Sequence, residues 1–425
     1  MALPYNKTQI LDQLTSAGLI DIFNDNLEKA AAKAQHMLEH EKLGWMRIVH
    51  EDYDIAPMAD HAARIRDTFT DVVILGTGGS SLGAKAATAI APIMELDGVT
   101  LHVPDSLCPF EMDVLLRKLP KDKTHILSIS KSGTTAETLS QTIVMMQWFE
   151  KNGISDLKDY FTFITEPGDR ILRQVAEKMA APILDHETDI GGRFSVLSNV
   201  GMLPAAVMGM KPRCFRKGAK DVIANLDDNP KDHAAVFGAA LIHTLNTEKN
   251  VTQTVLMPYA ESLRDLTRWW GQLWAESLGK DGLGTTPLVA VGPVDQHSQL
   301  QLYLDGPRDK MYTFITVPSF GQGPKIGGDA AKKMGLDYMA DCTIGDVVTL
   351  QSRATQNTLK NKGDIVREFT LETLNEYNLG MVFMSYMLET GITAGLMGID
   401  AYDQPAVEEG KILTRQYLND LQNKS

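Results

Sequence analysis

Short apolar runs alternate along this chain with longer segments in which apolar residues recur every three or four positions. The runs predict buried strands at residues 72–75, 101–105, 125–130, 160–165 and 181–186. Helical spacing fills the intervals between them, most clearly at 137–151. Strands that alternate with helices indicate parallel βαβ units, so we expect a doubly wound α/β sheet in the first half of the chain.

A polar stretch at 211–233 interrupts this alternation, which then starts again. The second series predicts helices at 234–245 and 262–278, and strands at 251–258, 286–292 and 311–317. The expected fold class is therefore α/β, with two doubly wound subdomains that each contain a parallel sheet.

The expected division of the chain has four parts. These are an N-terminal helical segment (1–45), two α/β domains (46–210 and 211–364), and a C-terminal helical segment that packs back on the body (365–425). In the last part, the largely apolar stretch 381–399 contains Glu389 and several glycines. Such residues favour a pair of buried helices over a membrane crossing.

The composition is that of a globular protein, since 44% of the 425 residues are hydrophobic and 22% are charged. The net charge of −13 disfavours nonspecific nucleic-acid binding but permits a small anionic substrate. No His, Cys or Asp cluster has metal-ligand spacing, so no metal is expected, and three distant cysteines are expected to be reduced. The N-terminal residues lack the features of a signal peptide, so a cytoplasmic protein is expected.

A glycine-rich loop, GTGGSSLG at 76–83, follows the first strand. It differs from the dinucleotide fingerprint because Ser81 replaces the third glycine, and from the Walker loop because Ala84 stands where lysine is needed. What remains is a tight turn before a helix, whose backbone N–H groups can face an anion or a sugar hydroxyl. A purely structural turn is an equally good interpretation of this loop alone.

A second loop, SKSGTTAET at 130–138, also connects a strand to a helix. Thr134 and Glu137 match a capping box, which predicts that the helix starts at Thr135. The loop before it combines hydroxyls, one ammonium group and the positive end of a helix dipole. These donors lie at the carboxyl end of a strand, so a bound phosphoryl group is favoured over a solvated lysine.

This second loop resembles the phosphate loop of the sugar isomerase superfamily. Four further segments narrow the resemblance to glucose-6-phosphate isomerases of the shorter bacterial type: GTGGSSLG, GGRFSVLS, ESLGK and QHSQLQLYLDGP. The resemblance extends from about residue 70 to residue 411, in the family's order. It implies reversible isomerisation of glucose 6-phosphate to fructose 6-phosphate through an enediolate, without a metal or other cofactor, in glycolysis and gluconeogenesis.

The resemblance assigns catalytic roles. Glu276 would move the proton between C1 and C2, and Arg193 would stabilise the enediolate. His297 and Lys411 would act in ring opening, with His297 supplied by the neighbouring subunit of a homodimer. Without the resemblance, the default interpretation of Glu276 is a helix-surface carboxylate paired with Lys280, and the other three would be ordinary surface or loop residues.

The same resemblance implies substrate-binding residues. They are Gly79, Ser80, Ser130, Lys131, Ser132, Thr135, Gln272 and Gln404. The hydroxyl-rich loop would hold the phosphate, and the first two residues would contact the sugar. Leu278 and Pro405 depart from the family pattern without touching these positions.

Three other functions stay open from the sequence. A dual phosphoglucose and phosphomannose isomerase would carry the same residues. A noncatalytic sugar-phosphate sensor would keep SKSGTT but would not need Glu276, Arg193 and His297 together. A Rossmann dehydrogenase is disfavoured by the failed fingerprint and by the lack of a suitable acidic residue near the second strand.

Overall fold

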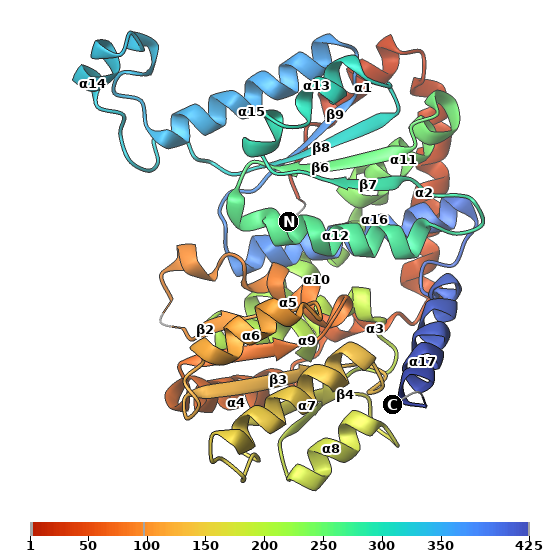
Figure 1. Cartoon of the computed structure of the whole chain (residues 1–425). Helices are drawn as coiled ribbons and strands as arrows, with labels where there is room; N and C mark the ends of the chain where they lie inside the picture. Colours follow the sequence, from red (N-terminus) through yellow and green to blue (C-terminus); the bar gives the residue numbers. More distant parts are fainter. Residues whose placement is uncertain (1–2, 97, 424–425) are drawn as a thin grey trace.

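The computed structural model describes residues 3–96 and 98–423, and its first half contains a five-stranded parallel sheet (Figure 1). The strands are β1 (Asp71–Leu75), β2 (Thr100–His102), β3 (Thr124–Ile129), β4 (Phe161–Thr165) and β5 (Ile183–Asp185). They lie in the order β2-β1-β3-β4-β5. The central strands β1 and β3 are in register, so the loops that follow them emerge side by side.

A second parallel sheet has the order β7-β6-β8-β9. Its strands are β6 (Gln253–Pro258), β7 (Thr286–Val289), β8 (Lys310–Thr316) and β9 (Val366–Thr370). The sequence predicts the first three, but it places residues 365–370 in a helical segment. That prediction is wrong, because β9 pairs in parallel with β8 along its whole length.

Helices connect the strands of both sheets, as the alternating pattern predicts. Around the first sheet these are α4 (Ile55–Thr68), α5 (Gly79–Thr88), α6 (Pro109–Lys118), α7 (Ala136–Lys151), α8 (Ile171–Met179) and α9 (Asn199–Val207). In the second half of the chain they are α10 (Pro212–Asp228), α11 (Ala234–Lys249), α12 (Arg264–Leu278), α13 (Leu300–Asp305), α14 (Gly328–Lys333) and α15 (Ile344–Asn361). The polar stretch at the expected domain boundary is mostly helix α10.

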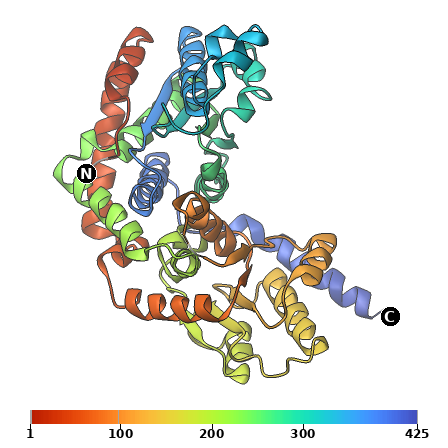
Figure 2. The same ribbon diagram turned by 90° about the vertical axis from the view of Figure 1, so that its left-hand side faces the viewer.

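Helix α16 (Glu376–Met397) is the centre of the molecule. It packs on α2, α10, α11 and α12, and in Figures 1 and 2 it runs between the two sheets. The sequence predicts a pair of helices here, whereas the structure has one continuous helix. Its length and composition would suit a membrane span, but most of it is buried inside the protein.

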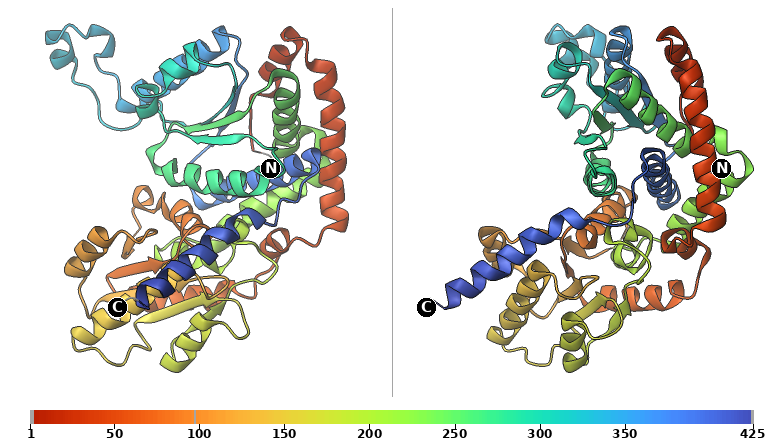
Figure 3. Two further views of the ribbon diagram at one scale, coloured as in Figure 1. Left: turned by 45° about the vertical axis from the view of Figure 1, so that its right-hand side comes forward. Right: turned by 90° about the vertical axis from the view of Figure 1, so that its right-hand side faces the viewer.

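The two ends of the chain are placed differently. The N-terminal helices α1 (Lys7–Ser16), α2 (Ile20–His40) and α3 (Gly44–Arg47) begin the chain, and α2 packs on α11 and α16 of the second half. The C-terminal helix α17 (Glu408–Gln422) extends away from the body with all its residues exposed (Figure 3). The prediction that residues 365–425 pack back on the body is therefore wrong for α17.

The two sheets are joined by a direct contact between α5 and α12. Helix α5 starts at Gly79, immediately after the loop that follows β1. Helix α12 carries the predicted base, Glu276, in its last turn. This contact therefore brings a loop of the first sheet to a helix of the second.

A buried ion pair fastens the second sheet to the central helix. Arg367 on β9 donates to both carboxylate oxygens of Glu389 on α16, at 2.7 and 2.8 Å, and both side chains are almost completely buried. Gly238 on α11 leaves the space for the pair, since a Cβ there would overlap both side chains.

Replacing Arg367 with leucine should leave the Glu389 carboxylate buried and unpaired. We expect a loss of about 3–5 kcal/mol in the free energy of unfolding, measured by urea denaturation. The double variant Arg367→Leu, Glu389→Leu removes both charges and should regain most of this loss. A double variant as unstable as the single one would contradict the assignment of the loss to an unpaired charge.

Candidate active site

A cleft of about 360 Å³ opens beside the contact between α5 and α12. Its lining residues are Thr77, Gly78, Gly79, Ser80, Lys131, Ser132, Thr135, Glu166, Arg170, Gly192, Arg193, Gln272, Glu276, Gln404 and Lys411. All the site residues predicted from the sequence are among them except Ser130 and His297. The fold thus gathers residues from positions 77 to 411 at one place, which spacing along the chain cannot reveal.

The glycine loop fits against its neighbours only because Gly78 and Gly79 have no side chains. Gly78 has a φ of 58°, and a Cβ there would lie 3.0 Å from the amide nitrogen of Gln272. At Gly79 a Cβ would overlap the carbonyl of Gly192 and lie 2.8 Å from the backbone nitrogen of Arg193. The loop therefore presses directly on the backbone that carries the arginine of the cleft.

The loop after β3 presents Lys131, Ser132 and Thr135 to the cleft, but not Ser130. Ser130 is only 1% exposed, and its hydroxyl oxygen lies 2.9 Å from that of Thr135. It also accepts a hydrogen bond from the backbone of Gly133, where φ is 66°. Ser130 thus holds the loop from beneath rather than lining the cleft.

Helix α7 begins at Ala136, one residue later than predicted, and Thr135 is its N-cap. The predicted capping box is wrong: among the described residues no side chain caps this helix. The hydroxyl of Thr134 donates instead to the hydroxyl oxygen of Ser132, at 3.1 Å. The first N–H groups of α7 therefore have no side-chain acceptor within the described chain and are available to an anion.

Charged groups surround this end of the cleft. The Lys131 ammonium donates to the carbonyl of Thr188 at 3.1 Å and lies 3.6 Å from a carboxylate oxygen of Glu166. Glu166 also accepts from the guanidinium of Arg170, at 2.6 Å. Two cations facing one carboxylate leave an excess positive charge, which suits an anionic ligand.

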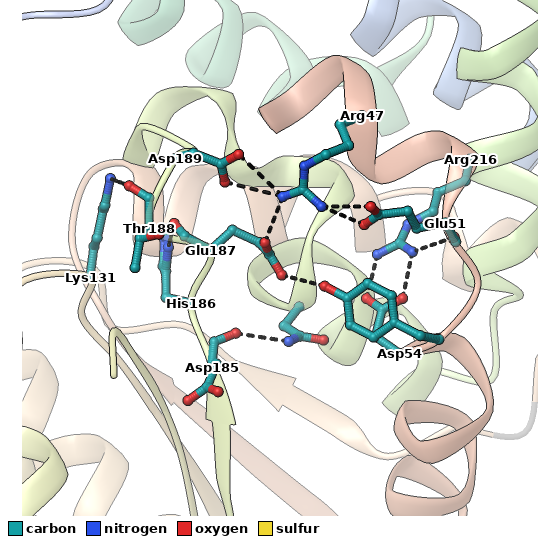
Figure 4. Close-up of polar contacts among 12 residues, drawn as sticks. Arg47, Glu51, Asp54, Lys131, Asp185, His186, Glu187, Thr188, Asp189 and Arg216 are labelled. Atoms are coloured by element: carbon teal, nitrogen blue, oxygen red, sulfur yellow. Dashed lines mark hydrogen bonds and ion pairs between the residues drawn. The ribbon is translucent and has the colours of Figure 1, made fainter. Parts of the chain in front are cut away.

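The wall beside Lys131 is the segment 185–189, and ion pairs fix it from the opposite side (Figure 4). The Arg47 guanidinium lies 2.9 Å from the carboxylate of Glu187 and 3.2 Å from that of Asp189. The same segment continues into the backbone that packs on the glycine loop. The N-terminal helix α3 therefore helps to hold this wall in place.

Arg193 is held rigidly, with a side chain only 3% exposed. It donates to the hydroxyl of Ser277 at 2.8 Å, to the side-chain oxygen of Gln404 at 2.9 Å and to the carbonyl of Asp403 at 2.9 Å. Burial lowers the pKa of its guanidinium, and the nearby Glu276 opposes that effect. Arginine remains protonated under such conditions, so the cleft contains a fixed positive charge.

Glu276 faces this arginine from α12. One carboxylate oxygen lies 3.5 Å from the Arg193 guanidinium, and the other accepts from Gln272, one turn earlier, at 3.0 Å. The side chain is 32% exposed, so the carboxylate is open to the cleft. The surface pairing of Glu276 with Lys280 does not form, because Lys280 lies 2.8 Å from a carboxylate oxygen of Asp403.

The predicted ring-opening residues are placed differently. Lys411 lies at the edge of the cleft on α17, where its ammonium is 2.6 Å from the carboxylate of Glu408. His297 is exposed and lines another cavity, of about 360 Å³, together with Tyr259, Glu261, Pro293, Val294 and Val348. Within the described part of this chain, His297 and Glu276 do not share a cavity.

Sequence reasoning missed several lining residues, among them Glu166, Arg170 and Thr77. Glu166 immediately follows β4, so it carries the same positional signal that identified Lys131: a polar residue at the carboxyl end of a central strand. Thr77 lies inside the glycine loop that was singled out. Arg170 lies beyond the end of its strand, and no sequence pattern identifies it.

A family model described as phosphoglucose isomerase matches residues 56–291, more than half of the chain. The chain belongs to the phosphoglucose isomerase family. A glucose-6-phosphate isomerase of Rubrobacter xylanophilus is 34% identical over 87% of this chain and 88% of its own length. A probable glucose-6-phosphate isomerase of Methanococcus maripaludis is 33% identical over 95% of this chain and 90% of its own length.

Solved structures agree with this family membership at the level of the fold. A hypothetical protein of Thermus thermophilus is 30% identical, with a TM-score of 0.87, over 97% of this chain and 98% of its own. A glucose-6-phosphate isomerase of Chlamydia trachomatis is 20% identical, with a TM-score of 0.71, over 93% of this chain and 78% of its own. Two parallel sheets with flanking helices are thus the architecture of a phosphoglucose isomerase fold.

Replacing Gly79 with alanine should force the glycine loop away from the backbone at Gly192. Arg193 would then move with that backbone, and a shift of about 1 Å at a catalytic group costs on the order of 100-fold in rate. We expect a fall of this size in kcat/KM in a steady-state assay of sugar phosphate isomerisation.

The matched control is Gly327→Ala, because a Cβ at Gly327 meets only the Cβ of Ala330, at 4.0 Å, and φ there is −60°. This variant should keep the wild-type rate. Equal rates for the two alanine variants would refute the importance of the close contact at Gly79.

Proposed function

We propose that this chain catalyses the reversible isomerisation of glucose 6-phosphate to fructose 6-phosphate. One observation carries the proposal: a carboxylate beside a buried guanidinium occupies the same cleft as a loop of hydroxyls and an ammonium. A phosphorylated six-carbon sugar has matching chemistry, with an anion at one end and an exchangeable carbon-bound proton at the other. The names of the relatives support the same substrate.

In this proposal Glu276 removes the proton from C2 and returns it to C1 of the opened sugar. The carboxylate is open to the cleft and is oriented by Gln272. Loss of the proton places negative charge on the enediolate oxygens. The fixed guanidinium of Arg193 is suited to stabilise that charge, since its other donors are already held by protein acceptors.

The phosphate is proposed to bind at the start of α7, on the groups of Lys131, Ser132 and Thr135. This site is remote from the reacting carbons, so its binding energy serves to position the sugar. Gly79 and Ser80 would contact the sugar, and Gln404 would keep Arg193 in place. Lys411 would donate to the ring oxygen during opening, together with His297.

The active unit is proposed to be a homodimer in which each chain supplies His297 to its partner. Two features support this arrangement. His297 is exposed and lies in another cavity from Glu276 within the described chain. Helix α17 exposes Ile412, Tyr417 and Leu418, an apolar surface that a second copy would cover.

The reaction is proposed to serve glycolysis and gluconeogenesis in the cytoplasm. Family membership supports this setting, and the net charge of −13 argues against a nucleic-acid partner. The helix of membrane-spanning length, α16, is mostly buried between the sheets, which argues against a membrane partner.

Glu276→Gln should lower kcat by about 10²–10⁴-fold, because an amide cannot accept the proton. The variant should still bind a phosphorylated aldonic acid, an enediolate mimic, as measured by calorimetry. A variant with a normal rate would contradict the assignment of Glu276 as the base.

Mixed dimers test the sharing of His297. Glu276→Gln and His297→Ala homodimers should both be inactive, whereas mixing and refolding them together should restore about one quarter of the wild-type rate, since half of the dimers are hybrids with one complete site. The control mixture, Glu276→Gln with Arg193→Ala, should stay inactive, because both changes affect the same chain's contribution. No recovery in the first mixture would sink the shared site.

A further inference from the structure

The second sheet has a cleft of its own, with a volume of about 300 Å³. It lies at the carboxyl ends of β6, β8 and β9, since Tyr259, Val317 and Thr370 line it and follow or end these strands. The chain leaves β6 toward β7 on one side and reaches β8 on the other. This is the switch point at which open α/β sheets bind ligands.

Helix α15 covers this cleft with an unusually polar face. Its lining residues recur at helical spacing and include Thr349, Ser352, Arg353, Gln356 and Lys360. A helix that only packs on a sheet presents apolar side chains at such positions. The polar face therefore indicates that the cleft accommodates a hydrophilic molecule.

The charges in the cleft are unequally paired. The Lys360 ammonium donates to the side-chain oxygen of Gln9 at 2.9 Å, and Glu368 accepts from the hydroxyl of Thr316 at 2.9 Å. Arg353 is exposed, and within residues 3–96 and 98–423 its guanidinium has no hydrogen bond or ion pair. One end of the cleft thus presents a free cation, and the other presents a pair of groups suited to hydroxyls.

A second polar group beside the cleft, the hydroxyl of Thr349, also lacks a hydrogen-bond partner in the described part of the chain. The hydroxyl oxygen of Thr349 is buried and has no hydrogen-bond partner among the described residues. A buried hydroxyl without a partner costs about 1–3 kcal/mol in protein mutational data. Thr349 lines the cleft, so rotation of its side chain toward a ligand oxygen there would remove that cost.

We propose that this second cleft binds a small anionic polyol, the class that contains phosphosugars and sugar acids, separately from the catalytic cleft. Its anionic group meets Arg353, and its hydroxyls meet Thr349, Thr316, Glu368 and Lys360. The volume, about 300 Å³ against about 360 Å³ for the catalytic cleft, is sufficient for a molecule of similar size.

The test is a calorimetric titration of the full chain with 6-phosphogluconate, which combines a phosphate, a carboxylate and hydroxyls. Wild-type protein should bind two molecules per chain. Lys131→Ala should weaken one site, and Arg353→Ala should weaken the other by at least about tenfold, the loss of one charge-assisted hydrogen bond. The matched control Arg117→Ala, an exposed arginine on α6, should leave both sites unchanged.

Thr349→Val provides a second variant that does not alter charge. It should raise the melting temperature of the free protein, because it removes a buried hydroxyl that has no partner within the described chain, and it should weaken only the site that Arg353→Ala weakens. A single site per chain, abolished by Lys131→Ala and untouched by Arg353→Ala, would overturn the proposal. Since each site has its own variant, the second cleft and the catalytic proposal can fail separately.

Discussion

The close contact of two backbone segments, at Gly79 and at Gly192, is the constraint on which the candidate site depends. A side chain on the first would drive the two segments apart, so the sequence must keep glycine where α5 begins. From this contact Arg193 reaches across to Ser277 on α12, and Glu276 of the same helix closes the cleft. The packing of α5 on α12 extends the contact to both sheets. The close backbone packing thus places the residues of the site, and hydrogen bonds then fix the orientation of their charged groups.

Much of this could be predicted from the sequence because parallel sheets obey a local rule: polar residues after central strands gather at one edge. The rule located Lys131 and the glycine loop. The prediction of strands from apolar runs failed for β9, because Arg367 and Glu368 interrupt the apolar run that marks a strand. The buried Arg367 is tolerated there only because it pairs with Glu389, which lies 22 residues later in the chain, on helix α16. The projection of α17 was missed for a related reason, since its apolar residues Ile412, Tyr417 and Leu418 are exposed and periodicity does not say which molecule covers them.

The two halves of the molecule use the same structural device. Each sheet has a switch point between its central strands, and each switch point opens into a cleft of similar volume. The first switch point places glycines and the long side chain of Lys131 beside the start of α7. The second is covered by the polar face of α15, whose own N-terminus is already capped by Thr343 and Asp346. The same topology would therefore offer an anion backbone donors in one half and side chains in the other.

The pairing of distant segments in the second half has a consequence for biogenesis. Residues 71–185 contain every strand of the first sheet, so this unit can form while synthesis continues. The second sheet cannot be completed so early, since Phe369 of its last strand forms a bridge with Tyr5, and α2 packs on the late helix α16. Helix α2 can pack on α11 as soon as that helix, which ends at Lys249, has been translated, but its contact with α16 must wait until nearly four hundred residues have been made. During that interval the face of α2 that α16 covers is the surface on which a nascent-chain chaperone would act.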